Sequence, residues 1–135
     1  MEFSTEFTGM FKFLIYFATG GVLTAMFLVT YMWVTPYKEI DLISRGDTAA
    51  AYSLGGALIG FIIPLSSAVI NSVNLLDMII WGLVALVIQI AVFFIVRVIF
   101  SNLTYSIEKG NTAEGMFLGA LSIAAGILNA ACMVY

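Results

Sequence analysis

Four stretches without a charged residue, each about twenty residues long, occupy most of this 135-residue chain. They are Phe13–Val34, Thr48–Ile70, Met78–Val96 and Met116–Tyr135. Because a helix rises about 1.5 Å per residue, about 20 residues cross a hydrocarbon core about 30 Å thick. Strands are excluded because lipid-facing backbone must be satisfied within its segment, and no barrel-like alternation is present. We therefore predict an all-α integral membrane protein with four transmembrane helices in the lipid bilayer.

Composition leaves little of the chain for a water-facing surface. Hydrophobic residues make up 62% of the chain and charged residues 10%, with a mean hydropathy of +1.10. A soluble domain is about half apolar and a quarter charged. A single membrane domain over residues 1–135 is expected. The net charge of −3 offers no basic surface for nucleic acid.

The residues that usually carry chemistry are scarce. Histidine is absent, and Cys132 is the one cysteine in the sequence. This removes zinc clusters, Cys/His nucleophilic pairs and an internal disulfide. No acid–base pair or nucleophile with its base is visible in the sequence. We expect a protein that is not an enzyme and that holds neither a metal nor a cofactor.

The basic residues predict the orientation in the membrane. Lys38 and Arg45 lie between the first two spans, and Arg97 and Lys109 flank the connection between the last two. Lys12 lies on the opposite side. Basic loops favour the cytoplasm. Both longer connections are therefore predicted to be cytoplasmic and both termini to be outside.

Two similar phrases indicate an internal repeat. Residues 45–49 read RGDTA and residues 109–113 read KGNTA, and the pair Leu-Gly recurs at 54–55 and 118–119, always 64 residues apart. Two tandem units, residues 10–73 and 74–135, would each hold a long helix, a polar connection and a glycine-rich helix. Because each unit crosses the membrane twice, the two units would have the same orientation. An axis along the membrane normal would relate them. The alternative is a cap that suits any helix entering from the cytoplasm.

The two phrases also supply the first set of candidate site residues: Asp47, Thr48, Asn111, Thr112 and Glu114. An Asp or Asn side chain before a helix accepts hydrogen bonds from free first-turn N–H groups. Asn111 and Glu114 have the spacing of a capping box. The alternative hypothesis is a cytoplasmic entry site for a cation or proton at Asp47 and Glu114.

Small residues predict where helices pack closely. The spacing Gly56-xxx-Gly60 and Gly115-xxx-Gly119 lets the backbones of membrane helices approach one another. The spacing leaves open whether the partner helix belongs to the same chain or to another copy.

Polar residues inside the spans form a second set of candidates: Thr19, Pro64, Ser66, Ser67, Gln89 and Asn129. Pro64 removes the hydrogen bond to the Gly60 carbonyl and predicts a kink. Polar groups inside membrane spans either line a path for a small solute or ion, or form hydrogen bonds between neighbouring helices.

Three phrases carry a family resemblance: GGALIGFIIPLSSAVINSV (55–73), WGLVALVIQI (81–90) and GNTAEGMFLGALSIAAGILNAACM (110–133). In these the chain resembles the YjfL-type inner-membrane proteins, catalogued as domain of unknown function 350. The resemblance implies a four-helix bacterial inner-membrane protein with two similar halves, and no established activity or catalytic residues. It also implies an association with envelope stress, because members tend to be encoded near phage-shock-like proteins and ATP-grasp ligases.

Two functional hypotheses follow. The first is a non-enzymatic membrane component of envelope homeostasis that forms homo-oligomers and docks a peripheral cytoplasmic protein. The second is a small channel or transporter that uses the polar layer around Pro64, Ser66 and Asn129.

Overall fold

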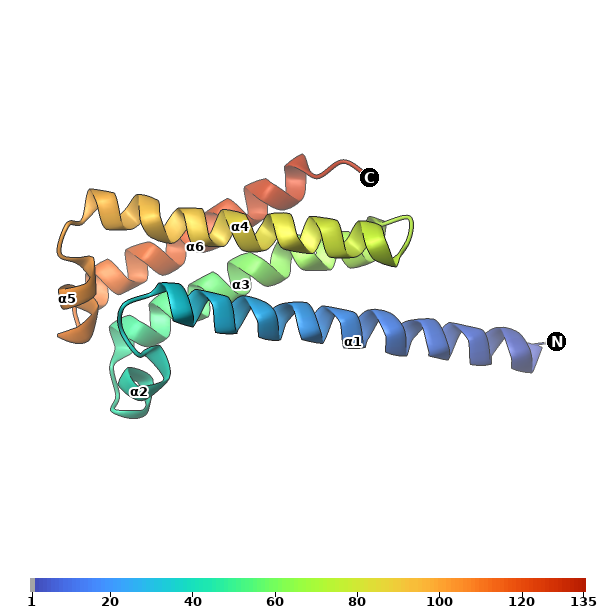
Figure 1. The fold of residues 1–135 in the computed structure, drawn as a ribbon, viewed down its shortest axis with the longest axis horizontal. Helices are drawn as coiled ribbons and strands as arrows, with labels where there is room; N and C mark the ends of the chain where they lie inside the picture. The colour runs from blue at the N-terminus through green and yellow to red at the C-terminus, as the bar shows by residue number, and fades with distance from the viewer. Residues whose placement is uncertain (1) are drawn as a thin grey trace.

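The computed structural model describes residues 2–135, so Met1, the first residue of the expected domain, lies outside the described residues. The described helices are α1 (Glu2–Val34), α2 (Glu39–Ser44), α3 (Thr48–Asn71), α4 (Leu75–Ile99), α5 (Leu103–Glu108) and α6 (Thr112–Cys132). Within residues 2–135, four of them are long and apolar enough to cross a membrane, which confirms the predicted helical membrane fold. In Figure 1, α2 and α5 lie together at the left end of the bundle, and both termini lie toward the other end.

The first long helix starts earlier than the sequence predicted. It begins at Glu2 rather than Phe13 and holds 33 residues, which corresponds to about 50 Å. Its first turns carry their own stabilising contacts: the rings of Phe3 and Phe7 stack with centroids 6.4 Å apart. Charged residues before Phe13 lower the hydropathy of that segment, but they do not interrupt the helix.

The helices α3 and α6 form the most extensive contact in the bundle. A Cβ atom added to Gly56 would overlap the backbone of Gly119, and one added to Gly126 would overlap the backbone of Gly60. Gly115 is equally close to the backbone of Ala49. The glycines of both motifs therefore pack against the other helix of the same chain.

Aromatic side chains pack α1 against α3 and α4. The rings of Phe27 and Phe61 stack with centroids 4.5 Å apart, and Tyr31 packs edge-on against Phe93 at 5.9 Å. Outside these contacts α1 is poorly covered: 11% of its apolar window is buried, compared with 50% in α3. Most of the core therefore lies among α3, α4 and α6, and α1 contributes Leu23, Phe27 and Tyr31 to it while the rest of its surface is largely uncovered.

The structure of the polar connections recurs at a spacing of 64 residues. The short helices cover residues 39–44 and 103–108, and the following long helices begin at Thr48 and Thr112. Gly46 and Gly110 have φ angles of 85° and 78°. This left-handed backbone favours glycine and turns the chain sharply into each helix.

Candidate functional site

The helices α3 and α6 are each capped by the residue before them. Asp47 Oδ1 accepts a hydrogen bond of 3.1 Å from the Ala50 N–H, and Asn111 Oδ1 accepts one of 3.3 Å from the Glu114 N–H. The Glu114 side chain does not complete a capping box, because the Asn111 N–H donates to the Ser106 carbonyl at 2.8 Å instead. The two caps act on equivalent N–H groups.

The first residues of α3 and α6 meet directly. Thr48 Oγ1 and Thr112 Oγ1 are 2.8 Å apart and share a hydrogen bond. This contact joins two residues that are 64 positions apart, which is the spacing of the repeated phrases. Of the residues predicted from the caps, the structure therefore brings Thr48 and Thr112 together.

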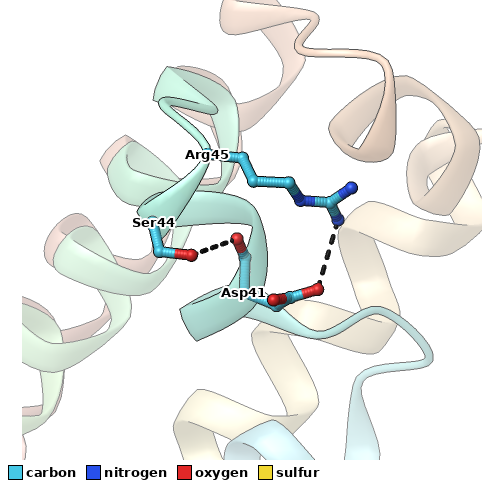
Figure 2. A network of polar contacts seen from close by, with 3 residues as sticks. All are labelled: Asp41, Ser44 and Arg45. Atoms are coloured by element: carbon cyan, nitrogen blue, oxygen red, sulfur yellow. Dashed lines mark hydrogen bonds and ion pairs between the residues drawn. The ribbon is translucent and has the colours of Figure 1, made fainter.

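A charged groove lies at the end of the bundle that carries α2 and α5, which we call the connector end. Its volume is about 470 Å³, and its lining includes Lys38, Asp41, Arg45, Glu108 and Lys109. Figure 2 shows Arg45 Nη2 bound to Asp41 Oδ2 at 3.3 Å, with Ser44 Oγ donating to the Asp41 carbonyl at 2.7 Å. Exposed ion pairs contribute at most about 1 kcal/mol. The groove is thus a solvated, mixed-charge surface.

The residues of the predicted polar layer lie in different contacts. Gln89 is fully buried, and its Nε2 donates to the Ser122 carbonyl at 3.1 Å. Gly60 is adjacent to both groups, so Gln89 binds at the α3–α6 crossing. Pro64 is buried within α3, which continues through it, and Asn129 is buried on α6.

The hydroxyl groups of the predicted layer point elsewhere. Thr19 donates to the Ile15 carbonyl of its own helix at 2.7 Å, and Ser67 pairs with the Tyr135 hydroxyl at 3.0 Å. Ser66 is exposed and lines an apolar groove between α1 and α3. Among the residues described, the six members of the layer form no hydrogen bond with one another.

A buried polar cluster near the connector end is absent from the sequence-based candidates. It consists of Tyr31, Thr35, Tyr37 and Glu39, and we call it the Glu39 cluster. The exposed fraction of Glu39 is 1%, and those of Tyr31 and Tyr37 are 1% and 3%. Glu39 Oε1 accepts a hydrogen bond of 2.7 Å from Thr35 Oγ1. Within residues 2–135, Glu39 Oε2 and the Tyr31 hydroxyl have no hydrogen-bond partner, and the Ser53 hydroxyl lies beside the Tyr37 hydroxyl.

Burial dominates the electrostatics of this cluster. It raises the pKa of Glu39 above its usual value of 4.5, and the hydrogen bonds from Thr35 and from the Glu39 backbone oppose the shift in part. Burial also raises the pKa of the Tyr37 hydroxyl, and the nearby Glu39 carboxyl adds to the increase. Both groups therefore favour their neutral forms.

One signal in the sequence points to Glu39. At the 64-residue spacing it aligns with Leu103, and the structure buries Leu103 completely. A glutamate at a position whose counterpart is a core leucine is unusual, because ionised carboxylates are rarely buried without a partner. The surrounding residues YKEID do not indicate a buried glutamate, because their charges are typical of a water-facing turn.

No metal-binding group emerges from the described part of the chain. Residues 2–135 contain no set of three or more His, Cys, Asp or Glu side chains close enough to hold a metal ion.

Comparison with known proteins places the chain in a family. The model of the Domain of Unknown Function (DUF350) family matches residues 4–133. The chain is 44% identical over 126 residues to the UPF0719 inner membrane protein YjfL of Escherichia coli strain K12, covering 93% of this chain and 96% of that protein. It is 26% identical over 118 residues to the UPF0719 transmembrane protein YshE of Bacillus subtilis, covering 86% and 88%. No solved structure matches it significantly. The chain therefore belongs to the DUF350 family of inner-membrane proteins.

Proposed function

We propose that this protein is a non-enzymatic component of the bacterial inner membrane that self-associates through α1 and serves envelope homeostasis. The observation that carries the proposal is the exposure of α1, whose apolar window is only 11% buried in the single chain. The link to the envelope rests on the family resemblance and on inner-membrane relatives. The cytoplasmic partner would bind the connector-end groove through its charged rim.

The glycines of the two motifs, Gly56, Gly60, Gly115 and Gly119, do not support self-association, because they already pack between α3 and α6. The exposed face of α1 carries a separate pair of small residues, Gly21 and Ala25, four positions apart. A Cβ atom added to Gly21 would meet no heavy atom of the described chain within 4 Å. Small residues at this spacing permit close helix approach in lipid. The contact we propose therefore lies on α1.

The tandem repeat belongs to the same proposal. The Thr48–Thr112 contact, the two glycine turns and the two caps are consistent with two copies of one two-helix unit, covering residues 10–73 and 74–135. An axis along the membrane normal would relate them, with both termini outside and the connector end in the cytoplasm.

Single-molecule counting of the labelled protein in liposomes tests self-association. We expect wild type to form oligomers, and Gly21→Ile to weaken association about tenfold, which corresponds to about 1.4 kcal/mol. The matched control is Ala91→Ile on α4, also exposed, which should associate like wild type. Single copies of wild type at every protein-to-lipid ratio would contradict the proposal, as would equal losses in the two variants.

The second candidate is the small channel or transporter. The observation that favours it is that Asn129 Nδ2 and Gln89 Oε1 are buried with no hydrogen-bond partner among residues 2–135, as expected if water reached them. This function predicts ion flux into liposomes that changes with Asn129→Ala. Vesicles that stay tight to a panel of salts would remove it.

A further inference from the structure

We infer that Glu39 is a proton-binding site: its carboxyl group carries a proton inside the buried cluster that α2 closes at the connector end. Nothing in the proposed function requires this site. Glu39 lies in the first turn of α2, and its side chain is turned into the bundle rather than toward water. The bound ligand is a proton, and Tyr31 and Tyr37 are the titratable groups that lie near it.

Hydrogen bonding distinguishes the two oxygens of the carboxyl group. Oε1 accepts from Thr35 Oγ1 at 2.7 Å, as the carbonyl oxygen of a neutral acid does. Oε2 is buried, and no donor among residues 2–135 reaches it. An ionised carboxylate presents about four acceptor sites, and the Thr35 hydroxyl and the Glu39 backbone N–H supply two donors, so the ionised form would leave about half of the sites unsatisfied. The proton is therefore assigned to Oε2.

The charges around the cluster do not compensate a carboxylate. Tyr31 faces it from α1 and Tyr37 from the connection. From the other elements, Asp47 adds a negative charge and Arg97 an exposed positive one, both acting on Tyr37. Among the residues described, no lysine or arginine forms an ion pair with Glu39. A buried charge without a partner is neutralised by taking up a proton.

A metal cation is the competing ligand, and the structure favours it less. Hard cations bind several oxygen ligands and usually more than one carboxylate. Glu39 is the one carboxyl group in the cluster, and burial raises its pKa, which favours the acid form. A proton neutralises this site without further ligands.

Infrared spectroscopy of the full chain in liposomes tests the site directly. We expect a carboxylic acid C=O band that persists above pH 4.5, the usual pKa of a glutamate, that is lost in Glu39→Gln and that decreases as pH rises further. Thr35→Val should shift the band, because it removes the hydrogen bond to Oε1 while keeping the acid. The matched control is Asp41→Asn, whose exposed carboxyl is two residues away and which should leave the band unchanged.

Two outcomes would overturn the inference. One is a pH titration in which Glu39→Gln removes no acid band above pH 4.5, which would show that Glu39 ionises like a water-facing glutamate. The other is an acid band that disappears when NaCl or KCl is added at constant pH, which would assign the site to a metal cation. If Glu39→Gln does not fold, a shifted band in Thr35→Val supports the inference, and an unshifted band contradicts it.

Discussion

At the scale of single residues, the glycines show what small-residue spacing predicts and what it leaves open. The sequence identified Gly56, Gly60, Gly115 and Gly119 as close-packing positions, and the structure places them between α3 and α6. The identity of the partner helix was not predictable, because a small residue permits an approach without specifying what approaches. Ser122, whose carbonyl fills the space at Gly60, carries no pattern of its own.

Replacing one of these glycines should separate the two helices. In Gly60→Ala the new methyl group would overlap the Ser122 carbonyl, so we expect a loss of about 1–3 kcal/mol in the free energy of unfolding. Gly55→Ala, in the same helix, meets no heavy atom of residues 2–135 within 4 Å and should be neutral or slightly stabilising. Denaturation by SDS in mixed micelles measures both. Equal losses in the two variants would show that the contact with Ser122 does not set the effect.

The buried amide of Gln89 should contribute a smaller amount. Gln89→Leu removes the hydrogen bond to the Ser122 carbonyl, and bonds between membrane helices contribute about 0.6–2 kcal/mol. The same SDS titration applies. Ser67→Ala, which removes an exposed bond to Tyr135, is the control and should change stability less. A Gln89→Leu protein as stable as wild type would show that the amide does not bond these helices.

At the scale of elements, the connections differ most from expectation. The caps were predictable because an Asx residue after glycine has a local chemical cause. The inward direction of Glu39 was not, because it depends on α2 packing over Tyr37 and Thr35, and a six-residue helix has too little periodicity to predict a face. The polar connection was therefore predictable from the sequence, whereas the burial of its carboxyl group was not.

Proton binding at Glu39 should make α2 docking depend on pH. Docking raises the pKa of Glu39 above 4.5, so the docked state binds more protons than the undocked state. Docking is then strongest below pH 4.5 and weakens as pH rises through the docked pKa. Maleimide labelling of Leu42→Cys, on the buried face of α2, should increase with pH relative to labelling of exposed Ser44→Cys.

The labelling ratio cancels the intrinsic pH dependence of the thiol reaction. Both variants carry Cys132→Ala, since Cys132 is exposed and would react. Adding Glu39→Gln should make the ratio independent of pH. A ratio that rises equally with and without Glu39 would assign the opening of α2 to another group.

At the scale of the whole molecule, hydropathy predicted how many helices cross the membrane and misplaced one end. The charged residues Glu6 and Lys12 interrupt the apolar run near the N-terminal end of α1. The helix nevertheless begins as early as Glu2, because no proline interrupts it. Hydropathy reports where lipid covers a helix, whereas backbone hydrogen bonding decides its length. The extra turns lengthen α1 beyond the hydrocarbon core and enlarge its unpaired surface.

The predicted orientation of the bundle in the membrane rests on the positions of the basic residues. Lys38 and Arg45 adjoin α2, and Arg97 and Lys109 flank α5, so all four lie toward the connector end, opposite Lys12. A bias of this kind retains basic connections in the cytoplasm. We expect a membrane-impermeant thiol reagent to label Asn74→Cys, between α3 and α4, in cells with a permeabilised outer membrane. Ser44→Cys should react only after the inner membrane is also disrupted, and both variants carry Cys132→Ala because Cys132 is exposed. The reverse pattern would invert the molecule and place the connector-end groove and Glu39 outside the cell, where a cytoplasmic partner has no access.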